Sequence, residues 1–594
     1  MIYAIVAIPL LVMAFLALAL KDHDKLLQYS ALAASILSLI IAVALWNDSS
    51  SVAVQTLAWF SVGKMQFSIA FINSPINLIA LLIIAIITPL IFLYSIGFMN
   101  IPSEQPRFYF EMCIFAASMM LFTISYSLIA IFITWEFLGI MSYLLIGFWY
   151  WKRAPPKAAR KAITLVFLGD LLLLSGIIIV GITYNSFLIS SLFTIPKVPI
   201  IEIALLLILF GAFSKSAQFP FEEWLPDAME GPTPVSAYLH SSTMVKAGVL
   251  LIAFLLPVYA VYNLLYIILL FGIISALIGA LNALASKHIK KILAYSTIED
   301  LGLMFIALGL NNIVAAMVLF VAQAFYKALL FMGAGSLMNA NNNKEDIYDI
   351  KGATFNKLIY ISLIFGVASL AAVFPLGGFF GKAAIEESSS GVVYVVLLLL
   401  EFLSTLYIFR WLFVTMKKDS SDIENIKLNY KALPNTMIIA MLFLVLAVAF
   451  SSIVYFYIPK ALIGGALNYF PYNALIADSI IAALGIVVAY LLFYKRRYVI
   501  KETYKWYKYA YLLFYNNTAV NLFYRYFVRF FAYISYLTGG IELSLEKAFY
   551  KSGDIGLMMS NKLRKIENGE INTFILSFII GIILILLIIV IFYL

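Results

Sequence analysis

Apolar residues occur along this chain in long stretches separated by short polar segments. About twenty apolar residues in an α-helix cross a bilayer core, which is about 30 Å thick. Stretches approaching that length lie near residues 2–20, 28–46, 73–96, 108–126, 128–150, 160–183, 200–219, 234–257, 261–285, 292–310, 312–339, 358–386, 391–416, 435–458, 473–494 and 572–594. The pattern predicts an all-α polytopic membrane protein with about 16 transmembrane helices, and the division near Tyr126 is left open.

Two regions depart from this pattern. Residues 50–71 alternate apolar and polar side chains between Ser and Asn clusters, which predicts a short exposed hairpin. Residues 519–566 form an amphipathic pattern with phenylalanines on one helical face and arginines opposite: Phe523, Phe527, Phe530, Phe531 and Ile534 against Arg525 and Arg529. A helix over this range would be about 70 Å long and too charged to span. We therefore expect a long lateral helix, with Asn516-Asn517 and Gly539-Gly540 as points where it would break.

Composition agrees with a chain surrounded by lipid. Hydrophobic residues make up 64% of the 594 positions and charged residues only 12%, about half the charged share of a soluble domain. The single Cys113 excludes disulfides within the chain and cysteine-ligated iron–sulfur clusters. No glycine-rich dinucleotide or phosphate loop follows a strand. Any redox chemistry must therefore belong to a partner, and we expect no cofactor and no metal on this chain.

The basic residues indicate an orientation. With the amino terminus outside, the short loops assigned to the cytoplasm hold 18 lysines and arginines and the opposite loops hold 3. This is the asymmetry expected of a correct span count. The net charge of +9 is therefore explained by membrane topology, and nucleic acid is not expected as a partner. We predict an integral protein of a prokaryotic cell membrane, with the lateral helix on the cytoplasmic side.

Ionisable side chains lie inside the apolar stretches, where each costs a few kcal/mol and marks a functional candidate. They are Glu136, Asp170, Lys215, His240, Lys246, Glu299, Asp300, Lys327, Lys382, Glu401 and Arg410. Structural ion pairs or residues snorkelling from helix ends are the alternative, and it applies most to Arg410, Glu401 and Asp300. Burial favours a neutral amine and a nearby carboxylate favours the ammonium. A carboxylate that moves would thus make a buried lysine hold or release a proton.

Two spans are predicted to be interrupted. Pro220 follows Lys215, and Pro375-Leu376-Gly377-Gly378 precedes Lys382. Proline frees backbone carbonyls, which at membrane depth must face protein or a wet cavity. Two successive sets of five spans would run in opposite directions, as inverted repeats of ion-coupled transporters do. The expected organisation is 1–107 (three helices and hairpin), 108–257 (first repeat), 258–416 (second repeat), 417–498 (two helices), 499–571 (lateral helix) and 572–594 (anchor).

Several motifs resemble one known family. The stretch from Lys215 to His240, KSAQFPFEEWLPDAMEGPTPVSAYLH, resembles the signature of antiporter-like subunits of respiratory complex I, shared with Mrp-type antiporters and membrane-bound hydrogenases. Further matches are Trp135-Glu136 with SYLLIGFW at 142–149, KILAYST at 291–297 and AFYKALLF at 324–331. The lateral helix favours the NADH-quinone oxidoreductase chain L (subunit 5) family.

The resemblance implies roles for particular residues. Glu136 would pair with Lys215, the relay of the first half-channel, and His240 and Lys327 would lie on a central axis. Lys382 would be the terminal lysine of the second half. In the family a histidine usually stands at the position of Gln323 and an aspartate at that of Ala383, so Glu386, one turn beyond Lys382, would substitute. The predicted proton path is Glu136, Asp170, Lys215, His240, Lys246, Glu299, Lys327, Lys382 and Glu386.

The functions compatible with these residues fall into three classes. The first is a proton-translocating subunit of a redox-driven NADH/quinone oxidoreductase-type complex, without redox chemistry of its own. The second, suggested by Lys246 and by Glu299-Asp300, is a subunit of an Mrp-type cation/proton antiporter or of a membrane-bound hydrogenase. The third is a structural strut whose buried charges only join helices. The expected partners are other membrane subunits, the lipid bilayer and protons, with sodium as the alternative ion.

Overall fold

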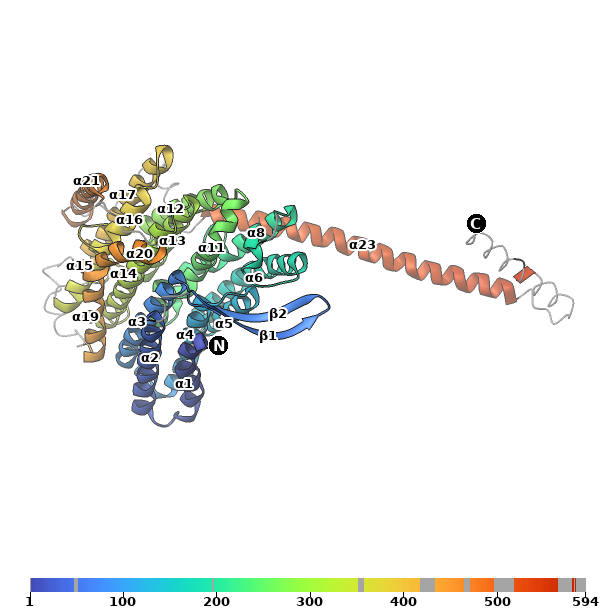
Figure 1. The fold of residues 1–594 in the computed structure, drawn as a ribbon, viewed down its shortest axis with the longest axis horizontal. Helices are drawn as coiled ribbons and strands as arrows, with labels where there is room; N and C mark the ends of the chain where they lie inside the picture. Colours follow the sequence, from blue (N-terminus) through green and yellow to red (C-terminus); the bar gives the residue numbers. More distant parts are fainter. Residues whose placement is uncertain are drawn as a thin grey trace. The chain divides into compact units, whose positions relative to one another are not determined.

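The computed structural model describes residues 2–47, 52–194, 197–350, 357–416, 433–463, 471–495 and 518–564, together with 580, 581 and 583. The chain divides into two compact units, Met1–Asn517 and Thr518–Leu594. The first unit contains the apolar helices and one hairpin, and the second contains one long helix (Figure 1). The two units are described separately.

The first unit is almost entirely helical, as the long apolar stretches predict. Its first half contains η1 (Ile2–Ala7), α1 (Ile8–Ala19), α2 (Asp24–Asn47), α3 (Pro75–Phe98), η2 (Pro102–Glu104), α4 (Gln105–Ile124), α5 (Leu128–Ile146), α6 (Ala154–Tyr184), α7 (Ser191–Thr194), α8 (Pro199–Lys215), α9 (Trp224–Asp227), η3 (Ala228–Glu230), α10 (Thr233–Ser241) and α11 (Met244–Val261). Its second half contains α12 (Leu265–Ala285), α13 (Ile289–Gly309), α14 (Ile313–Ala340), α15 (Lys357–Leu370), α16 (Gly377–Glu386), α17 (Gly391–Met416), α19 (Asn435–Phe450), η4 (Ser451–Ile453), α20 (Val454–Ile463), α21 (Tyr472–Ala489) and η5 (Tyr490–Lys495).

These helices confirm an all-α polytopic membrane protein. Within the described ranges, thirteen helices are long and apolar enough to cross a bilayer. The shorter α8 and the interrupted pair α15–α16 account for two more of the predicted spans. The division near Tyr126 is also correct, because α4 ends at Ile124 and α5 begins at Leu128. The last predicted span, 572–594, lies outside the described residues apart from three positions.

The hairpin predicted from alternating residues is present. Strand β1 (Val54–Val62) pairs antiparallel with β2 (Met65–Ile72), and Gly63 takes a left-handed conformation (φ +60°) in the turn. Most of β1 is exposed, whereas the end of β2 is buried. There the backbone N–H of Tyr126 donates to the carbonyl of Ala70 at 2.8 Å. The hairpin is thereby attached to the connection between α4 and α5.

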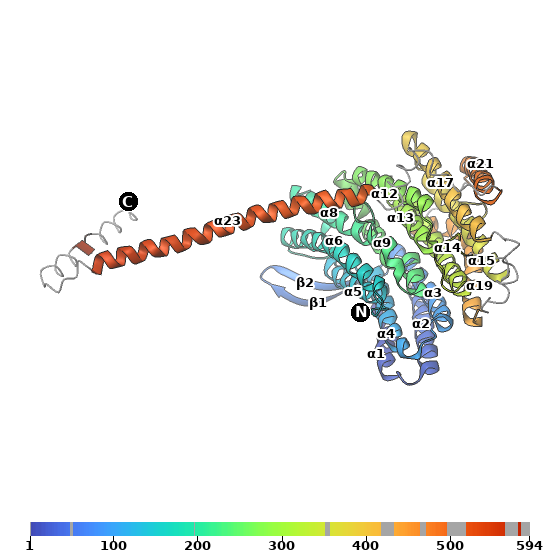
Figure 2. The same ribbon diagram turned by 180° about the vertical axis from the view of Figure 1, so that it is seen from behind.

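Helices α13 and α14 form the centre of the first unit. Nearly all of their residues are buried, and α14 contacts α3, α10, α13, α15, α16 and α19. In Figures 1 and 2 both helices run through the middle of the bundle. Glycines bring α12 close to α13, because a Cβ on Gly279 would lie 2.6 Å from the backbone nitrogen of Glu299. Charged residues on α13 and α14 are therefore remote from lipid.

The two predicted helix interruptions are present and share one local structure. After α8, Ala217 has a left-handed φ of +48° and the Phe219–Pro220 bond is cis. After α15, Ala372 has a φ of +55° and the Phe374–Pro375 bond is cis. The two segments therefore match residue for residue, with Ala217 corresponding to Ala372.

The backbone hydrogen bonds around the two breaks also match. The N–H of Ala217 donates to the backbone carbonyl of Ser214, and the N–H of Ala372 donates to that of Ser369, each at 3.2 Å. The next N–H group in each copy reaches back five residues, from Gln218 to Phe213 at 2.8 Å and from Val373 to Ala368 at 2.9 Å. This recurrence agrees with a repeated helical unit.

A third interruption was not predicted from the sequence, which led us to expect one continuous span over 234–257. Helix α10 ends at Ser241 and α11 begins at Met244. Between them Thr243 leaves helical conformation (φ −117°, ψ −116°), and its hydroxyl donates to the carbonyl of Tyr238 at 2.6 Å. The break contains no proline or glycine, so no local sequence signal marks it.

The second unit consists of one long helix, α23 (Thr518–Arg564). Its 47 residues correspond to a length of about 70 Å at the rise of an α-helix. The helix continues through Gly539-Gly540, so the predicted break there is wrong; the other expected break, Asn516-Asn517, lies outside the described residues. On the predicted apolar face, Phe530 is 58% and Ile534 37% exposed.

Candidate functional site

The first group of buried charges surrounds the end of α8. Lys215, the last residue of that helix, is fully buried, and its Nζ lies 3.5 Å from Oδ2 of Asp170 on α6. Asp170 Oδ1 accepts a hydrogen bond from the indole N–H of Trp135 on α5 at 2.5 Å. The ring of Trp135 lies 5.0 Å from the Lys215 nitrogen, a cation–π distance. The ammonium is therefore held by one carboxylate and one aromatic face.

This geometry changes the expected role of Glu136. Glu136 is half-buried on α5 and interacts electrostatically with both Asp170 and Lys215. In the described part of the chain no ion pair within 4.0 Å joins Glu136 to Lys215, so the direct partner is Asp170 instead. Gly139, one turn further along α5, leaves room for the amine, because a Cβ there would lie 3.0 Å from Lys215 Nζ.

The central group is built on α13 and α14. Lys327 is fully buried in the middle of α14. Its Nζ donates to Ser296 Oγ at 2.5 Å and lies 3.0 Å from Oδ2 of Asp300, both on α13. Asp300 was among the functional candidates, with a structural ion pair as the alternative, and was left out of the predicted path. It is the ion-pair partner of Lys327, one of the residues predicted for that path.

His240 lies at the end of α10, beside the unpredicted break. Its ring is fully buried against Phe331, with ring centroids 5.2 Å apart. Neither ring nitrogen has a hydrogen-bond partner among the described residues. Gln323, at the position where the family usually has a histidine, donates from Nε2 to the backbone carbonyl of His240 at 3.3 Å. Gln323 therefore holds the backbone of the break.

Lys246 lies on the first turn of α11, just beyond the same break. Its Nζ donates to the carbonyl of Phe320 at 2.5 Å and lies 4.2 Å from the centre of the Phe320 ring. Asp300 and Lys327 act on it electrostatically. Two breaks, after α8 and after α10, thus carry three of the predicted path residues.

Uncharged polar groups line these two breaks. Several buried oxygens there have no hydrogen-bond partner in the described ranges: Ser216 Oγ, Gln218 Oε1, Ser241 Oγ and Ser242 Oγ. Gly248 on α11 packs so closely on the end of α8 that a side chain there would collide with Ala212 and Ser216. Buried polar groups are almost always satisfied by protein or by water. These oxygens are therefore suited to hydrogen bonds with water.

The second half carries a further group on α13, α16 and α17. The Nζ of Lys382 donates to the carbonyl of Leu370 at 2.9 Å and to Ser404 Oγ at 2.8 Å. Glu299 Oε2 accepts a hydrogen bond from the Tyr407 hydroxyl at 2.6 Å. Glu299 interacts electrostatically with both Lys382 and Lys327. It links the central group to the terminal lysine.

Beyond Lys382 lies a cluster of three buried carboxylates, Glu386, Glu401 and Asp478. One oxygen of each lies within 4.8 Å of the others. A cavity of about 10 Å³ is lined by Lys382, Glu386 and Glu401. The predicted proximity of Glu386 to Lys382 is thus present, but Asp478 comes from α21, a helix outside both predicted repeats. We refer to these three residues below as the carboxylate cluster.

The motif from 215 to 240 is anchored near its middle by ion pairs. Lys161 on α6 contacts Glu223 at 2.7 Å and Asp227 at 2.8 Å, and Lys291 on α13 lies 3.6 Å from Asp227. Lys290 donates to the carbonyl of Gly231 at 3.1 Å. These contacts fix the segment after the first break against α6 and α13.

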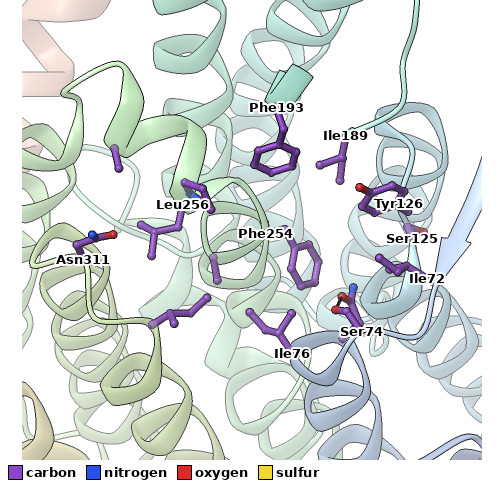
Figure 3. Close-up of a pocket in the computed structure, with 15 residues that line it drawn as sticks. Ile72, Ser74, Ile76, Ser125, Tyr126, Ile189, Phe193, Phe254, Leu256 and Asn311 are labelled. Atoms are coloured by element: carbon purple, nitrogen blue, oxygen red, sulfur yellow. Dashed lines mark hydrogen bonds between the residues drawn. The ribbon is translucent and has the colours of Figure 1, made fainter. Parts of the chain in front are cut away.

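A sizeable cavity lies away from the buried charges. It has a volume of about 560 Å³ and is bounded by the start of α3, the link between α4 and α5, and the end of α11. Figure 3 shows Ile76, Phe193 and Phe254 around it, with Tyr126 at one side. No residue of the predicted path lines this cavity.

Comparison with known proteins identifies the family. The family model described as "NADH:quinone oxidoreductase/Mrp antiporter, TM" matches residues 125–408, and the one described as "NADH-Ubiquinone oxidoreductase (complex I), chain 5 N-terminus" matches residues 59–109. NADH-quinone oxidoreductase subunit L of Buchnera aphidicola subsp. Acyrthosiphon pisum (strain APS) is 33% identical over 579 residues, covering 93% of this chain and 92% of the relative. The chain belongs to the NADH-quinone oxidoreductase subunit L (chain 5) family. It is a proton-translocating, antiporter-like membrane subunit, as the resemblance predicted.

Two solved structures share its fold. A chain of the Mrp complex from Dietzia sp. DQ12-45-1b superposes with a TM-score of 0.72 at 22% identity, over 89% of this chain and 60% of that chain. A chain of an archaeal membrane-bound sulfane sulfur reductase, described as a respiratory membrane complex, superposes with a TM-score of 0.69 at 19% identity. The match covers 81% of this chain and 99% of that chain. The present chain thus spans about 60% of the length of the Mrp chain that it matches.

Sequence reasoning missed two kinds of residue at this site. Asp478 is a lone carboxylate in an apolar stretch and could have been found by the rule that identified Glu136. Ser216, Gln218 and Ser242 carry no charge, so nothing in their local sequence distinguishes them from ordinary polar residues of membrane helices.

Proposed function

We propose that this chain conducts protons within a redox-driven NADH/quinone oxidoreductase-type complex, and that the buried charges form the path. The observation that carries the proposal is the Lys215–Asp170 ion pair, fully buried at the end of an interrupted helix. A buried pair is costly to desolvate and is a poor means of stabilising a bundle. Its position beside unpartnered polar oxygens favours transport over a structural role.

The proposed route runs through three groups. It passes from Glu136, Asp170 and Lys215 through water at the two breaks to His240 and Lys246, then to Lys327 with Asp300, and through Glu299 to Lys382 and Glu386. Lys215 and Lys327 each face a carboxylate, and Lys382 faces the Ser404 hydroxyl. Lys246 donates to a carbonyl and interacts with Asp300 electrostatically, so it would exchange its proton through water. The electrostatic contacts of Glu299 with Lys327 and Lys382 support continuity across the second half.

Transfer would depend on the separation of charges. The attraction between Lys215 and Asp170 falls as their distance grows, and it is strong only where water is scarce. If Asp170 moved toward Glu136, Lys215 would lose its partner, and burial would then favour release of its proton. Protonation of Glu136 or Asp170 would have the same effect. The ion pair is therefore a switch that a partner could operate.

The complex and its orientation complete the proposal. The relative from Buchnera is named as an NADH-quinone oxidoreductase subunit, so we assign electron transfer to other subunits and expect this chain to contact them within the membrane. The loop asymmetry of lysine and arginine supports an outside amino terminus and a cytoplasmic α23. A helix of that length could contact several neighbours.

Proton pumping by the assembled complex tests the path. Lys215→Ala should lower the number of protons moved per electron in reconstituted vesicles, because the relay of the first half is gone. Lys197→Ala removes an exposed lysine whose amine contacts the carbonyl of Val261 and the ring of Tyr262, and should pump normally. A normal ratio for Lys215→Ala, in a complex with all subunits present, would contradict the proposal.

A second candidate is cation/proton exchange without electron transfer. The carboxylate cluster favours it, because three buried acids are more than a single proton relay requires. Vesicles containing the purified complex but no electron donor would distinguish the two. Sodium-driven proton movement under those conditions favours exchange, and movement only on addition of donor and quinone favours the redox-driven pump.

A further inference from the structure

The carboxylate cluster carries more negative charge than its surroundings balance. Glu386, Glu401 and Asp478 are 3%, 1% and 0% exposed. Lys382 is the cation that acts on all three. Three carboxylates and one ammonium leave two uncompensated negative charges, which a buried site cannot hold without a large desolvation cost. Two further positive charges must therefore reside in the cluster.

The oxygens of the cluster are aimed at one another and lack donors. Both carboxylate oxygens of Glu401, both of Asp478 and Oε2 of Glu386 accept no hydrogen bond from outside the cluster in the parts of the chain that the structure describes. Within the cluster, Asp478 lies within hydrogen-bonding reach of Glu386 and Glu401. Carboxylates only accept hydrogen bonds, so they cannot satisfy each other unless one is protonated. Lys382 does not fill this need, because its ammonium donates to Leu370 and Ser404.

The neighbouring cavity limits what can bind. Its volume of about 10 Å³ is about that of a single water position. A magnesium ion usually keeps several waters, and calcium takes six to eight oxygen ligands. One small ion stripped of most of its water fits this volume beside Glu386 and Glu401. The Asp478 oxygen does not line the cavity, but it lies within 4.8 Å of an oxygen of each glutamate.

We propose that the carboxylate cluster binds one sodium ion together with one proton, and that a second proton replaces the sodium ion. Both states supply two positive charges, so the exchange leaves the buried charge unchanged. When sodium binds, one carboxyl O–H bond breaks and the proton leaves to water. The cluster adjoins the second broken helix, and broken helices are where ion-coupled transporters bind sodium and protons.

The exchange would change the electrostatic potential at several ionisable groups in or near the cluster. They are Lys382 on α16, Tyr394 on α17, and Glu299 on α13, which interacts with Lys382. Loss of the sodium ion and its replacement by a proton moves the positive charge from the centre of the cluster to one carboxyl group. The repulsion between the Lys382 ammonium and that positive charge would change, because the distance between them changes. The inference extends the outer end of the proposed route, but the binding itself does not require transport.

Direct binding of radioactive sodium to the purified, fully assembled complex tests the inference. We expect saturable sodium binding at alkaline pH that protons displace and that potassium, calcium and magnesium do not. Asp478→Asn and Glu401→Gln each remove one ligand charge with little change of shape. Each should weaken the binding by at least about tenfold, since even residues behind the ligands of a metal site commonly contribute that much. Glu202→Gln changes an exposed carboxylate on α8 and should bind sodium like the wild type.

The outcomes separate this inference from the proposed proton path. Equal sodium binding by the wild type and both cluster variants would overturn the site, as would displacement of sodium by calcium or a response to protons alone. Lys215→Ala should keep its sodium binding even where pumping is lost. Intact pumping in Lys215→Ala would instead refute the path and leave the sodium site standing. Subunit composition, checked by gel filtration, excludes misassembly as the cause of a loss.

Discussion

The two broken helices have the same backbone but place their lysines on opposite sides of the break. Lys215 is the last residue of α8, two positions before Ala217. The corresponding position before Ala372 is Leu370, which has no charge. Lys382 comes instead from α16, after the break, and its ammonium donates to the carbonyl of Leu370 at 2.9 Å. The same point of each repeat therefore receives an amine, although the sequence supplies it from different directions.

The partners of the two amines differ as well. Lys215 lies 3.5 Å from a carboxylate oxygen of Asp170, whereas Lys382 donates only to neutral oxygens of Leu370 and Ser404 among the described residues. The acids of the second half are gathered in the carboxylate cluster. In the first half the ammonium is paired with one carboxylate, whereas in the second it lies beside a group of acids without a direct ion pair among the described residues. The backbone break therefore determines where an amine lies in each half, while the surrounding helices determine whether its partner is a carboxylate or a neutral oxygen.

Making the first half resemble the second should have the largest effect. Lys215→Leu leaves Asp170 buried without its partner, and breaking a buried pair costs about 3–5 kcal/mol. We expect both lower thermal stability and loss of proton pumping. The double variant Lys215→Leu/Asp170→Leu should recover most of the stability, since an apolar replacement of a whole pair is often neutral. Recovery of pumping as well would contradict the role of the pair.

Moving the second amine across its break tests the correspondence directly. Lys382→Leu should lower pumping severalfold, because the amine at the second break is lost. Lys382→Leu/Leu370→Lys restores an amine at the position equivalent to Lys215 and should pump more than the single variant. Proton-to-electron ratios of the assembled complex measure both. If the double variant pumps no better, the location of the amine alone does not determine its function.

The two acids near Lys215 should differ in effect. Asp170→Asn removes the direct partner, and we expect a larger fall in pumping than for Glu136→Gln, whose side chain is half-buried and acts from a longer distance. Pumping rates of the two variants, measured side by side in the same vesicles, give the order. A larger effect of Glu136→Gln would mean that Lys215 pairs with Glu136 during turnover.

A loop outside both breaks should show the smallest effect. His288 Nε2 lies 3.1 Å from Oε2 of Glu345, and the hydrogen bond from His288 lowers the pKa of that carboxyl. A lowered pKa in the folded state stabilises the loop above the ordinary pKa of glutamate. This contribution is lost as pH falls through the lowered value. The side chain of Glu345 is 52% exposed, so the contribution should stay below about 1 kcal/mol.

Amide exchange measures this loop. Ile289 donates to the carbonyl of Glu345 at 2.8 Å and Ile347 to that of Lys287 at 3.0 Å. Glu345→Gln should speed exchange of these two amides at neutral pH and have little effect in acid, where the carboxyl of the wild type is already protonated. Pumping should not change, and a loss of pumping would link this loop to the path.

The sequence by itself determined the class of the protein and most of its important residues. Long apolar stretches gave the spans, and charges within them marked Lys215, Lys327 and Lys382, because the cost of burying a charge in lipid is a property of each residue and its local segment. The prolines at 220 and 375 marked two breaks, because the missing backbone donor of a proline is also a property of the residue itself.

Only the tertiary structure decided how these residues act on one another. Asp170, not Glu136, lies against Lys215, Asp478 joins Glu386 and Glu401 from a distant helix, and α10 breaks at Thr243 without a local signal. Each of these depends on distances between helices far apart in the chain. Such distances are set by side-chain packing across the whole bundle, and packing has no periodicity or composition that a local stretch of sequence can display.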